Sequence, residues 1–140
     1  MSTVVVDTGV FSAPLIARRA VGQTLHDQYR RHLVGQQVAI TTQTLAEIYF
    51  GAEVANWGAT RRARLDALVD TAAVIAPHEA MCRRFGSLRA ELRRTGHPLH
   101  QDHHVGDLWI ATTAIHYGLP LVAHDKVFKE CPGLELRTEV

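Results

Sequence analysis

Four acidic residues stand at positions from which their carboxylates could act together. They are Asp7, Glu47, Asp107 and Asp125. Asp7 and Asp125 come at the ends of short apolar runs that predict buried strands, whereas Glu47 and Asp107 lie in the predicted first turns of helices. In a parallel α/β layout, strand ends and the following helix starts share one edge of the sheet, where ligands bind. We therefore expect the four carboxylates to converge there, although they are far apart in the chain.

Four carboxylates in one cleft repel one another, and such a cluster is tolerated when it is partly protonated or when a cation neutralises it. Oxygen ligands of this kind select Mg²⁺ or Mn²⁺ over softer metals. Bound divalent ions can activate a water and stabilise the leaving oxygen of a phosphodiester. The residue types therefore predict metal-assisted phosphodiester hydrolysis.

Each acid also has a purely structural interpretation, which the sequence leaves open. Thr44 and Glu47 match the spacing of a helix capping box. Asp107 could be a helix N-cap, Asp125 a turn residue, and Asp7 a cap for the helix that follows it. Asp102, close to Asp107 in the sequence, is interpreted as a solvated loop residue.

Strand and helix patterns alternate along the chain, which predicts an α/β fold with a mostly parallel sheet. Apolar runs predict strands at 4–6, 38–41, 73–76, 121–123 and 134–136. Helices are expected between them, the first starting near Ser12 with Pro14 in its first turn, the fifth over 79–94 and the last from Asp107. The stretch 96–106, rich in His, is expected to be a loop. With no repeat and no linker, residues 1–140 are interpreted as one domain.

The composition is that of an ordinary globular protein, with 46% hydrophobic and 21% charged residues. The sequence contains neither an apolar run long enough to span a bilayer nor a secretory signal pattern, so we expect no membrane association. Two cysteines are too few for a disulfide framework and favour a cytoplasmic setting. Thirteen of the fifteen basic residues are Arg, whose planar guanidinium grips phosphate, although GC-rich coding also favours Arg.

Each acid lies within a short patterned segment, and the segments are Val4–Thr8, Thr42–Gly51, Asp107–Ala114 and Leu121–Phe128. In order and spacing, these segments resemble the four motifs of the PIN-domain proteins found as toxins of VapBC toxin–antitoxin pairs. The resemblance covers nearly the whole chain. It implies a PIN-like, three-layer α/β/α fold with a mostly parallel central sheet.

The resemblance further implies an endoribonuclease that depends on Mg²⁺ or Mn²⁺, with RNA as substrate and tRNA as one candidate. It implies a homodimer and a small antitoxin whose tail occupies the acidic groove. Carried over by position, the four acids are the catalytic residues and metal ligands, and Thr8 is a polar neighbour that holds Asp7 or a metal-bound water. Two residues depart from the family pattern: Gly9 stands where Asn or Ser is common, and His124 where Asn is common. We expect the ring of His124 to contact a carboxylate, a phosphate or a metal.

RNA binding requires cations, because an acidic groove alone would repel the RNA backbone. Of the arginine clusters, we expect four residues to lie closest to function, namely Arg18, Arg19, Arg61 and Arg62. Three other functions are alternatives to the ribonuclease: a binding module with a degraded catalytic site, a phosphatase with Asp7 as nucleophile, and a phospho-acceptor receiver domain. Gly9 disfavours the phosphatase, which needs a second Asp at that position, and the receiver needs adjacent acids after its first strand.

Overall fold

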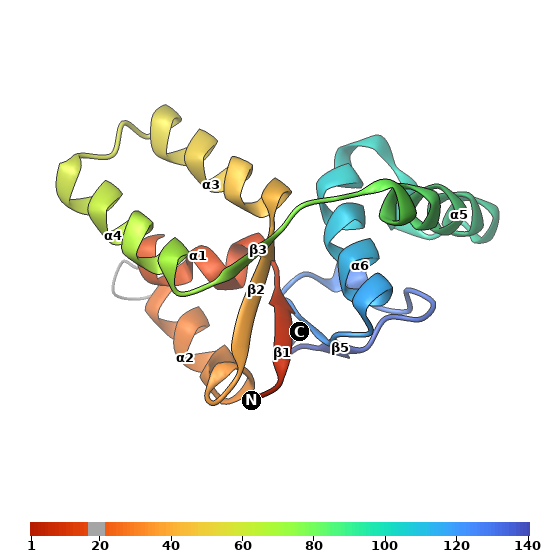
Figure 1. The fold of residues 1–140 in the computed structure, drawn as a ribbon, viewed down its shortest axis with the longest axis horizontal. Coiled ribbons are helices and arrows are strands. Elements are labelled where there is room, and N and C mark those ends of the chain that lie inside the picture. Colours follow the sequence, from red (N-terminus) through yellow and green to blue (C-terminus); the bar gives the residue numbers. More distant parts are fainter. Residues whose placement is uncertain (17–21) are drawn as a thin grey trace.

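The computed structural model describes residues 1–16 and 22–140, and in it a five-stranded parallel sheet lies between two layers of helices (Figure 1). The strands are β1 (Thr3–Val6), β2 (Gln37–Thr41), β3 (Ala73–Ile75), β4 (Leu121–Val122) and β5 (Leu136–Arg137). The helices are α1 (Thr8–Ile16), α2 (Gly22–Leu33), α3 (Thr42–Val54), α4 (Ala59–Asp70), α5 (Glu79–Thr95) and α6 (Val105–Tyr117). Three short 3₁₀ turns complete the described elements, η1 (Pro98–His100), η2 (Asp102–His104) and η3 (Lys126–Phe128).

The strands follow the order β3-β2-β1-β4-β5, and every pair is parallel. The chain builds outward from β1 to β2 and β3, and then crosses to the other side of β1 to add β4 and β5. The order of the strands therefore reverses between β1 and β4. In open parallel sheets such a reversal leaves a crevice at the carboxyl ends of the strands.

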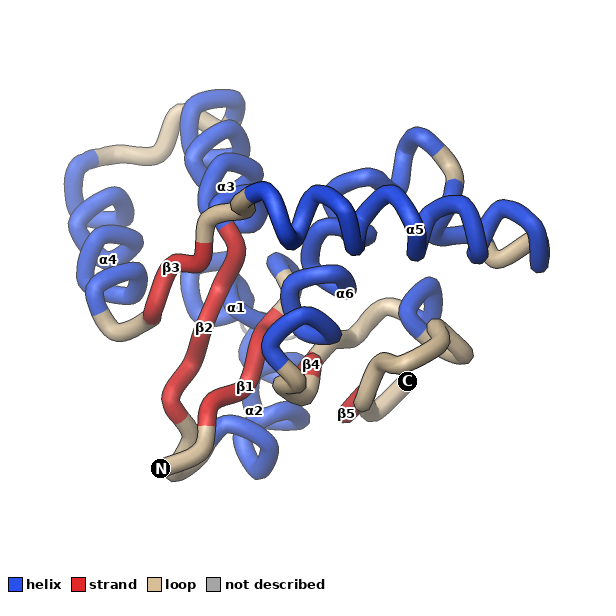
Figure 2. Tube along the Cα trace, turned by 45° about the vertical axis from the view of Figure 1, so that its right-hand side comes forward, coloured by secondary structure: helices blue, strands red, loops and turns tan. Residues whose placement is uncertain are grey.

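The central strand β1 is buried on both faces, as its unbroken run of valines predicts. Val5 faces a core formed with α5 and α6, whereas Val4 and Val6 face a second core formed with helices α1 to α4. Figure 2 shows these two groups of helices on opposite sides of the strands. The predicted three-layer α/β/α fold with its parallel sheet is thus confirmed. None of the described helices is both long and apolar enough to cross a membrane.

The first helix begins earlier than predicted. Helix α1 starts at Thr8, so Ser12 does not cap it and Pro14 lies in its interior. The reason is Asp7, whose Oδ1 accepts a hydrogen bond of 2.9 Å from the backbone N–H of Val10. A carboxylate in this position satisfies one of the free donors at the helix start.

The stretch 96–106 is not the loop that was predicted. It contains η1 and η2, and α6 already begins at Val105. The ring Nδ1 of His97 accepts from the backbone N–H of Leu99 at 3.1 Å, and the side chain of Leu99 is fully buried. A single apolar side chain and a histidine cap therefore order a segment whose composition is typical of a loop.

A buried tyrosine on α2 holds the last residues of the chain through hydrogen bonds. The hydroxyl of Tyr29 accepts from the backbone N–H of Glu139 at 2.8 Å and lies 2.7 Å from Nδ1 of His124 and 3.2 Å from Oγ1 of Thr138. The carboxylate of Glu139 also pairs with Arg31 and His32 on α2. Tyr29 itself has no exposed surface, so these polar groups depend on one another for partners.

We predict that Tyr29→Phe lowers the free energy of unfolding by about 1–3 kcal/mol, because it removes the one hydroxyl that bonds the Glu139 N–H, His124 and Thr138. Urea unfolding of both proteins measures the change. Tyr49→Phe is the matched control: Tyr49 is 41% exposed, and its hydroxyl should contribute less than about 0.5 kcal/mol. Equal effects of the two substitutions would contradict the assigned role of the Tyr29 hydroxyl.

Candidate active site

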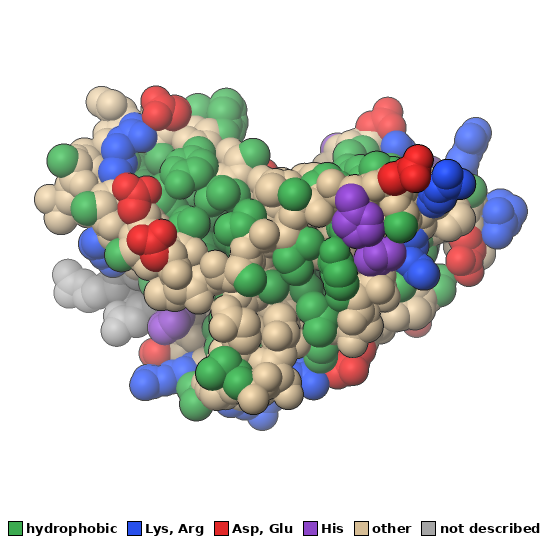
Figure 3. Space-filling model, viewed as in Figure 1, with side chains coloured by type: hydrophobic (Ala, Val, Ile, Leu, Met, Phe, Trp, Pro, Cys, Tyr) green, Lys and Arg blue, Asp and Glu red, His purple; other side chains and the backbone are tan. Residues whose placement is uncertain are grey.

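The four predicted acids gather at the carboxyl edge of the sheet. Asp7 follows β1, Asp125 follows β4, Glu47 is on α3 directly after β2, and Asp107 is in the first turn of α6. Helix α3 packs against α6 across this edge. In Figure 3 the surface is notched at the top of the view, between the side formed by α3 and α4 and the side formed by α5 and α6.

Asp7 is the buried member of the group, with a residue exposure of only 6%. Its Oδ1 receives the bond from Val10, and its Oδ2 receives a longer one of 3.4 Å from the backbone N–H of His124. The pKa of Asp7 is raised from 3.8 to about 6, mainly by burial; the two backbone hydrogen bonds oppose this rise, and the charges of Asp107 and Asp125 add to it. Both interpretations of Asp7 therefore hold together, since it caps α1 and belongs to an acidic cluster.

Glu47 lies on the second turn of α3, not on the first as predicted. The helix begins at Thr42 and is capped by Thr41, whose hydroxyl accepts from the backbone N–H of Thr44 at 3.1 Å. The capping box between Thr44 and Glu47 is therefore absent, and the Glu47 carboxylate is free to face α6. It lies so close to Gly106 that a Cβ at that glycine would be 3.0 Å from Glu47 Oε1.

The pKa of Glu47 is raised, first by partial burial and then by the charge of Asp107, while the Thr8 hydroxyl lowers it. Asp107 is the third residue of α6, so the alternative in which it is the N-cap of this helix is wrong. Its Oδ2 lies 3.0 Å from Nδ1 of His104. Burial raises the pKa of Asp107, the contact with His104 lowers it, and the charge of Asp125 raises it.

Asp125 is exposed, and its Oδ1 accepts from the backbone N–H of Val127 at 2.9 Å. It therefore caps η3, as the turn interpretation predicted, while its charge also acts on Asp7 and Asp107. The neighbouring His124 contacts the Asp7 carboxylate through its backbone N–H, whereas its ring turns toward the Tyr29 hydroxyl. A contact of the ring with a phosphate or a metal stays a prediction.

Thr8, predicted to hold Asp7 or a metal-bound water, donates from Oγ1 to Oγ1 of Thr44 at 3.0 Å, which links the start of α1 to the start of α3 beside the strand ends. Two other residues around the acids were missed in the sequence. His104 contacts Asp107 from the preceding turn, and Gly106 makes room for Glu47. A histidine three residues before an acid at a helix start is a signal that could have indicated His104. Nothing local indicates Gly106, because its role depends on a side chain 59 positions earlier.

The donor set matches a hard divalent cation in its chemistry, because it consists of carboxylate oxygens. The charges of Asp107 and Asp125 raise the pKa values of neighbouring acids, which a bound cation would relieve. Within residues 1–16 and 22–140, no three His, Cys, Asp or Glu side chains form a ready-made metal-binding group. The structure thus brings the four acids to one edge and couples them electrostatically. That all four hold one shared ion stays a prediction.

Of the four arginines predicted to contact RNA, two lie within the described residues. Arg18 and Arg19 lie outside the described residues. Arg61 stacks its guanidinium 4.5 Å from the centre of the Trp57 ring and donates to the carbonyl of Leu15. Arg62 donates to the carbonyls of Trp57 and Ala52 and pairs with Glu53 at 2.9 Å. Arg61 therefore joins α4 to α1, Arg62 joins α4 to the end of α3, and a role of either residue in RNA binding stays a prediction.

Comparison with known proteins identifies the class to which this fold and site belong. The model of the PIN domain family matches residues 4–134. The ribonuclease VapC5 of Mycobacterium tuberculosis is 30% identical over 132 residues, which cover 92% of this chain and 87% of the relative. A chain in the crystal structure of VapBC-5 from the same organism is 25% identical and superposes with a TM-score of 0.66, covering 99% of this chain and 98% of that chain.

A further solved structure, VapBC2 from Rickettsia felis bound to a DNA fragment from its promoter, contains a chain of the same fold. It superposes with a TM-score of 0.77 at 21% identity, covering 97% of this chain and 98% of that chain. The chain described here therefore belongs to the PIN domain family, within its VapC branch. The phosphatase and receiver-domain alternatives are set aside by this membership.

We predict that Asp7→Asn raises the free energy of unfolding near neutral pH by roughly 3 kcal/mol at most, when metal is removed with EDTA. Above about pH 6 the folded protein carries a buried charge that the unfolded chain exposes to water. This penalty shrinks as the pH falls from about 6 to 3.8 and is absent below, where both states are protonated. Urea unfolding on either side of this pH window measures the gain.

The matched control is Asp66→Asn, which removes an exposed aspartate from α4. It should change the free energy of unfolding by less than about 0.5 kcal/mol at either pH. A loss of stability in Asp7→Asn near neutral pH, or a gain that is independent of pH, would show that burial does not govern this carboxyl.

Proposed function

We propose that this protein is a metal-dependent endoribonuclease that hydrolyses RNA phosphodiester bonds and acts as the toxin of a toxin–antitoxin pair. The family membership and the similarity to the ribonuclease VapC5 support a nuclease. The observation that carries the proposal is the gathering of four carboxylates at the carboxyl edge of a parallel sheet, where the charges of Asp107 and Asp125 raise the pKa values of neighbouring acids. A groove of this kind suits divalent cations and the phosphates that accompany them.

In this proposal Asp7, Glu47, Asp107 and Asp125 hold Mg²⁺ or Mn²⁺ and are the catalytic residues. When bound, the ion supplies Lewis acidity toward the phosphodiester and lowers the pKa of water. The chain itself supplies the orientation of the ligands. The His124 N–H holds one oxygen of Asp7, and His104 holds one oxygen of Asp107. Thr8 contributes a hydroxyl between the starts of α1 and α3.

The alternative of a degraded, non-catalytic binding module is not favoured. Its support came from Gly9 and His124, the two departures from the family pattern. Glycine at position 9 does not change the room around the Asp7 carboxylate, because even a Cβ at this position would lie 4.0 Å from Asp7 Oδ1, an ordinary contact distance. At position 124 the contact with Asp7 comes from the backbone, which any residue except proline supplies. Neither substitution removes a carboxylate from the group.

The proposed partners are a small antitoxin and a second copy of this chain. Solved structures of the same fold are VapBC complexes, which supports an antitoxin. Helix α3 presents large apolar side chains to solvent, including Phe50 and Val54, each 71% exposed. An exposed apolar surface of this kind is typical of a protein interface and supports homodimerisation. We place the protein in the cytoplasm, where free cysteines such as Cys82 and Cys131 stay reduced.

We predict that the purified protein cleaves RNA with added Mg²⁺ or Mn²⁺, that EDTA abolishes cleavage, and that Asp125→Asn lowers the rate about a hundredfold or more. Asparagine keeps the Oδ1 acceptor that caps η3, so the fold should survive. Gel analysis of RNA cleavage measures the rate, and calorimetric titration with Mn²⁺ measures metal binding separately. Asp66→Asn is the control, because it removes one acid from an exposed site on α4.

Full cleavage by Asp125→Asn, or cleavage that continues in EDTA, would contradict the proposed chemistry. Mn²⁺ binding of equal strength in Asp125→Asn and the wild type would remove Asp125 from the ligand set even if activity fell.

We predict that Gly106→Ala separates stability from activity. Alanine is the better helix former and should stabilise α6 by up to about 1 kcal/mol. Its Cβ would lie 3.0 Å from Glu47 Oε1, so the carboxylate must move by a few tenths of an ångström. We expect a lower cleavage rate and weaker Mn²⁺ binding in a protein that is at least as stable as the wild type. Gly51→Ala on α3, where a Cβ meets no atom within 4 Å, should stabilise without changing either quantity.

A further inference from the structure

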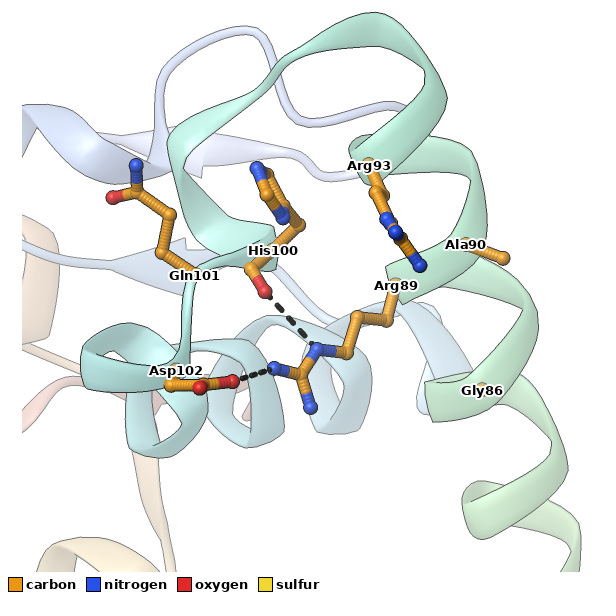
Figure 4. A pocket seen from close by; sticks show the side chains of 7 residues that line it. All are labelled: Gly86, Arg89, Ala90, Arg93, His100, Gln101 and Asp102. Carbon is orange, nitrogen blue, oxygen red and sulfur yellow. Dashed lines mark hydrogen bonds and ion pairs between the residues drawn. The ribbon is translucent and has the colours of Figure 1, made fainter.

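A second hollow in the surface lies between α5 and the two turns η1 and η2 (Figure 4). It is an open groove of about 490 Å³. Arg89 and Arg93 line it from α5, and His100 and Asp102 line it from the turns. None of these four residues takes part in the acidic edge described above. We call this hollow the α5–η groove.

The α5–η groove carries more positive than negative charge. Arg89 and Arg93 are four residues apart, so both side chains lie on the same face of α5. Arg89 donates to the carbonyl of His100 at 3.0 Å and pairs with Asp102 at 2.6 Å, and Figure 4 shows it crossing the groove to reach them. Arg93 makes no ion pair with any residue in the described part of the chain. A guanidinium in this position offers its planar donors to an incoming anion.

The groove and the acidic edge share one short element. Asp102 opens η2 and lines the groove, while His104 closes the same turn and lies 3.0 Å from Oδ2 of Asp107. The groove and the first turn of α6 are therefore joined by a single turn of three residues. The groove is therefore placed to hold a part of the same molecule whose reacting bond lies at the acids.

An RNA backbone needs such a place, because the four carboxylates repel its phosphates. The side chains of Arg61 and Arg62 are engaged with backbone carbonyls around α3 and α4. Arg89 instead reaches Asp102 of η2, the turn that directly precedes α6. The exposed carboxylate of Asp102 is the one acid in its lining, and it occupies the position on Arg89 that a phosphate oxygen would take.

We propose that the α5–η groove binds the phosphate backbone of the RNA substrate next to the scissile bond, with Arg93 and Arg89 as the contacting residues. Asp102 competes with the phosphate for Arg89 and is displaced when RNA binds. This inference rests on the proposed function, because it takes RNA as the substrate of the acidic edge.

Binding of a short, single-stranded fluorescent RNA, followed by anisotropy in EDTA so that the RNA stays intact, tests the proposal. Arg93→Gln should weaken binding about tenfold at low salt, because one charge-assisted contact is lost. The slope of log affinity against log salt concentration should fall in magnitude by about 0.7, the value for one phosphate contact on a single strand. Asp102→Asn should instead tighten binding severalfold, because it frees Arg89.

Arg94→Gln is the matched control. Arg94 is the next residue of α5 and carries the same charge, but it lines a different hollow, beside Ile115 and Pro132. It should change affinity less than Arg93→Gln does, with a salt slope close to that of the wild type. Thermal unfolding of all three variants confirms that each is folded.

Equal losses in Arg93→Gln and Arg94→Gln would overturn the proposal, because general charge would then account for binding. Weaker binding in Asp102→Asn would also overturn it, since Asp102 would then act as a structural support for Arg89. If Arg93→Gln binds RNA normally but loses affinity for the antitoxin, the groove is a protein-binding site and the inference is wrong. A wild-type protein that cleaves RNA while Arg93→Gln shows an unchanged KM would refute the groove alone, whereas a wild type that cleaves no RNA would refute the proposed function.

Discussion

The burial of a carboxylate at the end of the central strand is the constraint on which this structure depends. Asp7 follows a strand that is buried on both faces, and its backbone N–H still belongs to the sheet through a bond to the carbonyl of Val122. Its side chain is therefore held in the interior, where ionisation is unfavourable and the pKa rises to about 6. Two backbone N–H groups, from Val10 and His124, make the charged form tolerable.

Those two donors tie the acid to both sides of the strand reversal. Val10 belongs to α1, which follows β1, and His124 follows β4, the strand that pairs with β1 on its other side. The geometry of Asp7 thus depends on β4 being in register with β1, through the pairing of Val6 with Val122. The ring of His124 also contacts the Tyr29 hydroxyl, which accepts a hydrogen bond from the backbone N–H of Glu139 near the end of the chain. The acidic edge and the carboxyl-terminal segment are in this way parts of one hydrogen-bonded unit.

Around the acidic edge, the acidic and the basic side chains lie on different elements. The acids come from strand ends and helix starts, where free backbone N–H groups favour negative charge. The arginines of α5 lie one element away and meet the edge only through η2. Arginines on the α4 side are committed to backbone carbonyls instead. A polyanion that approaches the acids would therefore meet a different environment on the two sides of the notch.

Much of this arrangement is determined by the sequence alone. The unbroken run Val4–Val6 requires a strand buried on both faces, and the alternation of strand and helix patterns requires a parallel sheet whose carboxyl ends meet. The four acids follow from that layout, because their positions relative to the strands are local properties. The start of α1 differs from its prediction, because Ser12 and Pro14 match the pattern of a helix start, whereas the donor at the real start, the Val10 N–H, is capped by Asp7.

Only the tertiary structure decided what surrounds the acids. Whether Arg62 faces solvent or the carbonyls of α3, and whether the ring of His124 faces Asp7 or Tyr29, depends on partners 10 and 95 residues away. The place of Glu47 against Gly106 likewise arises from the packing of α3 on α6. Patterns in sequence report the periodicity of one element, which fixes the faces of that element. Contacts between elements depend on how those faces pack, and packing is set by all the side chains of the core together.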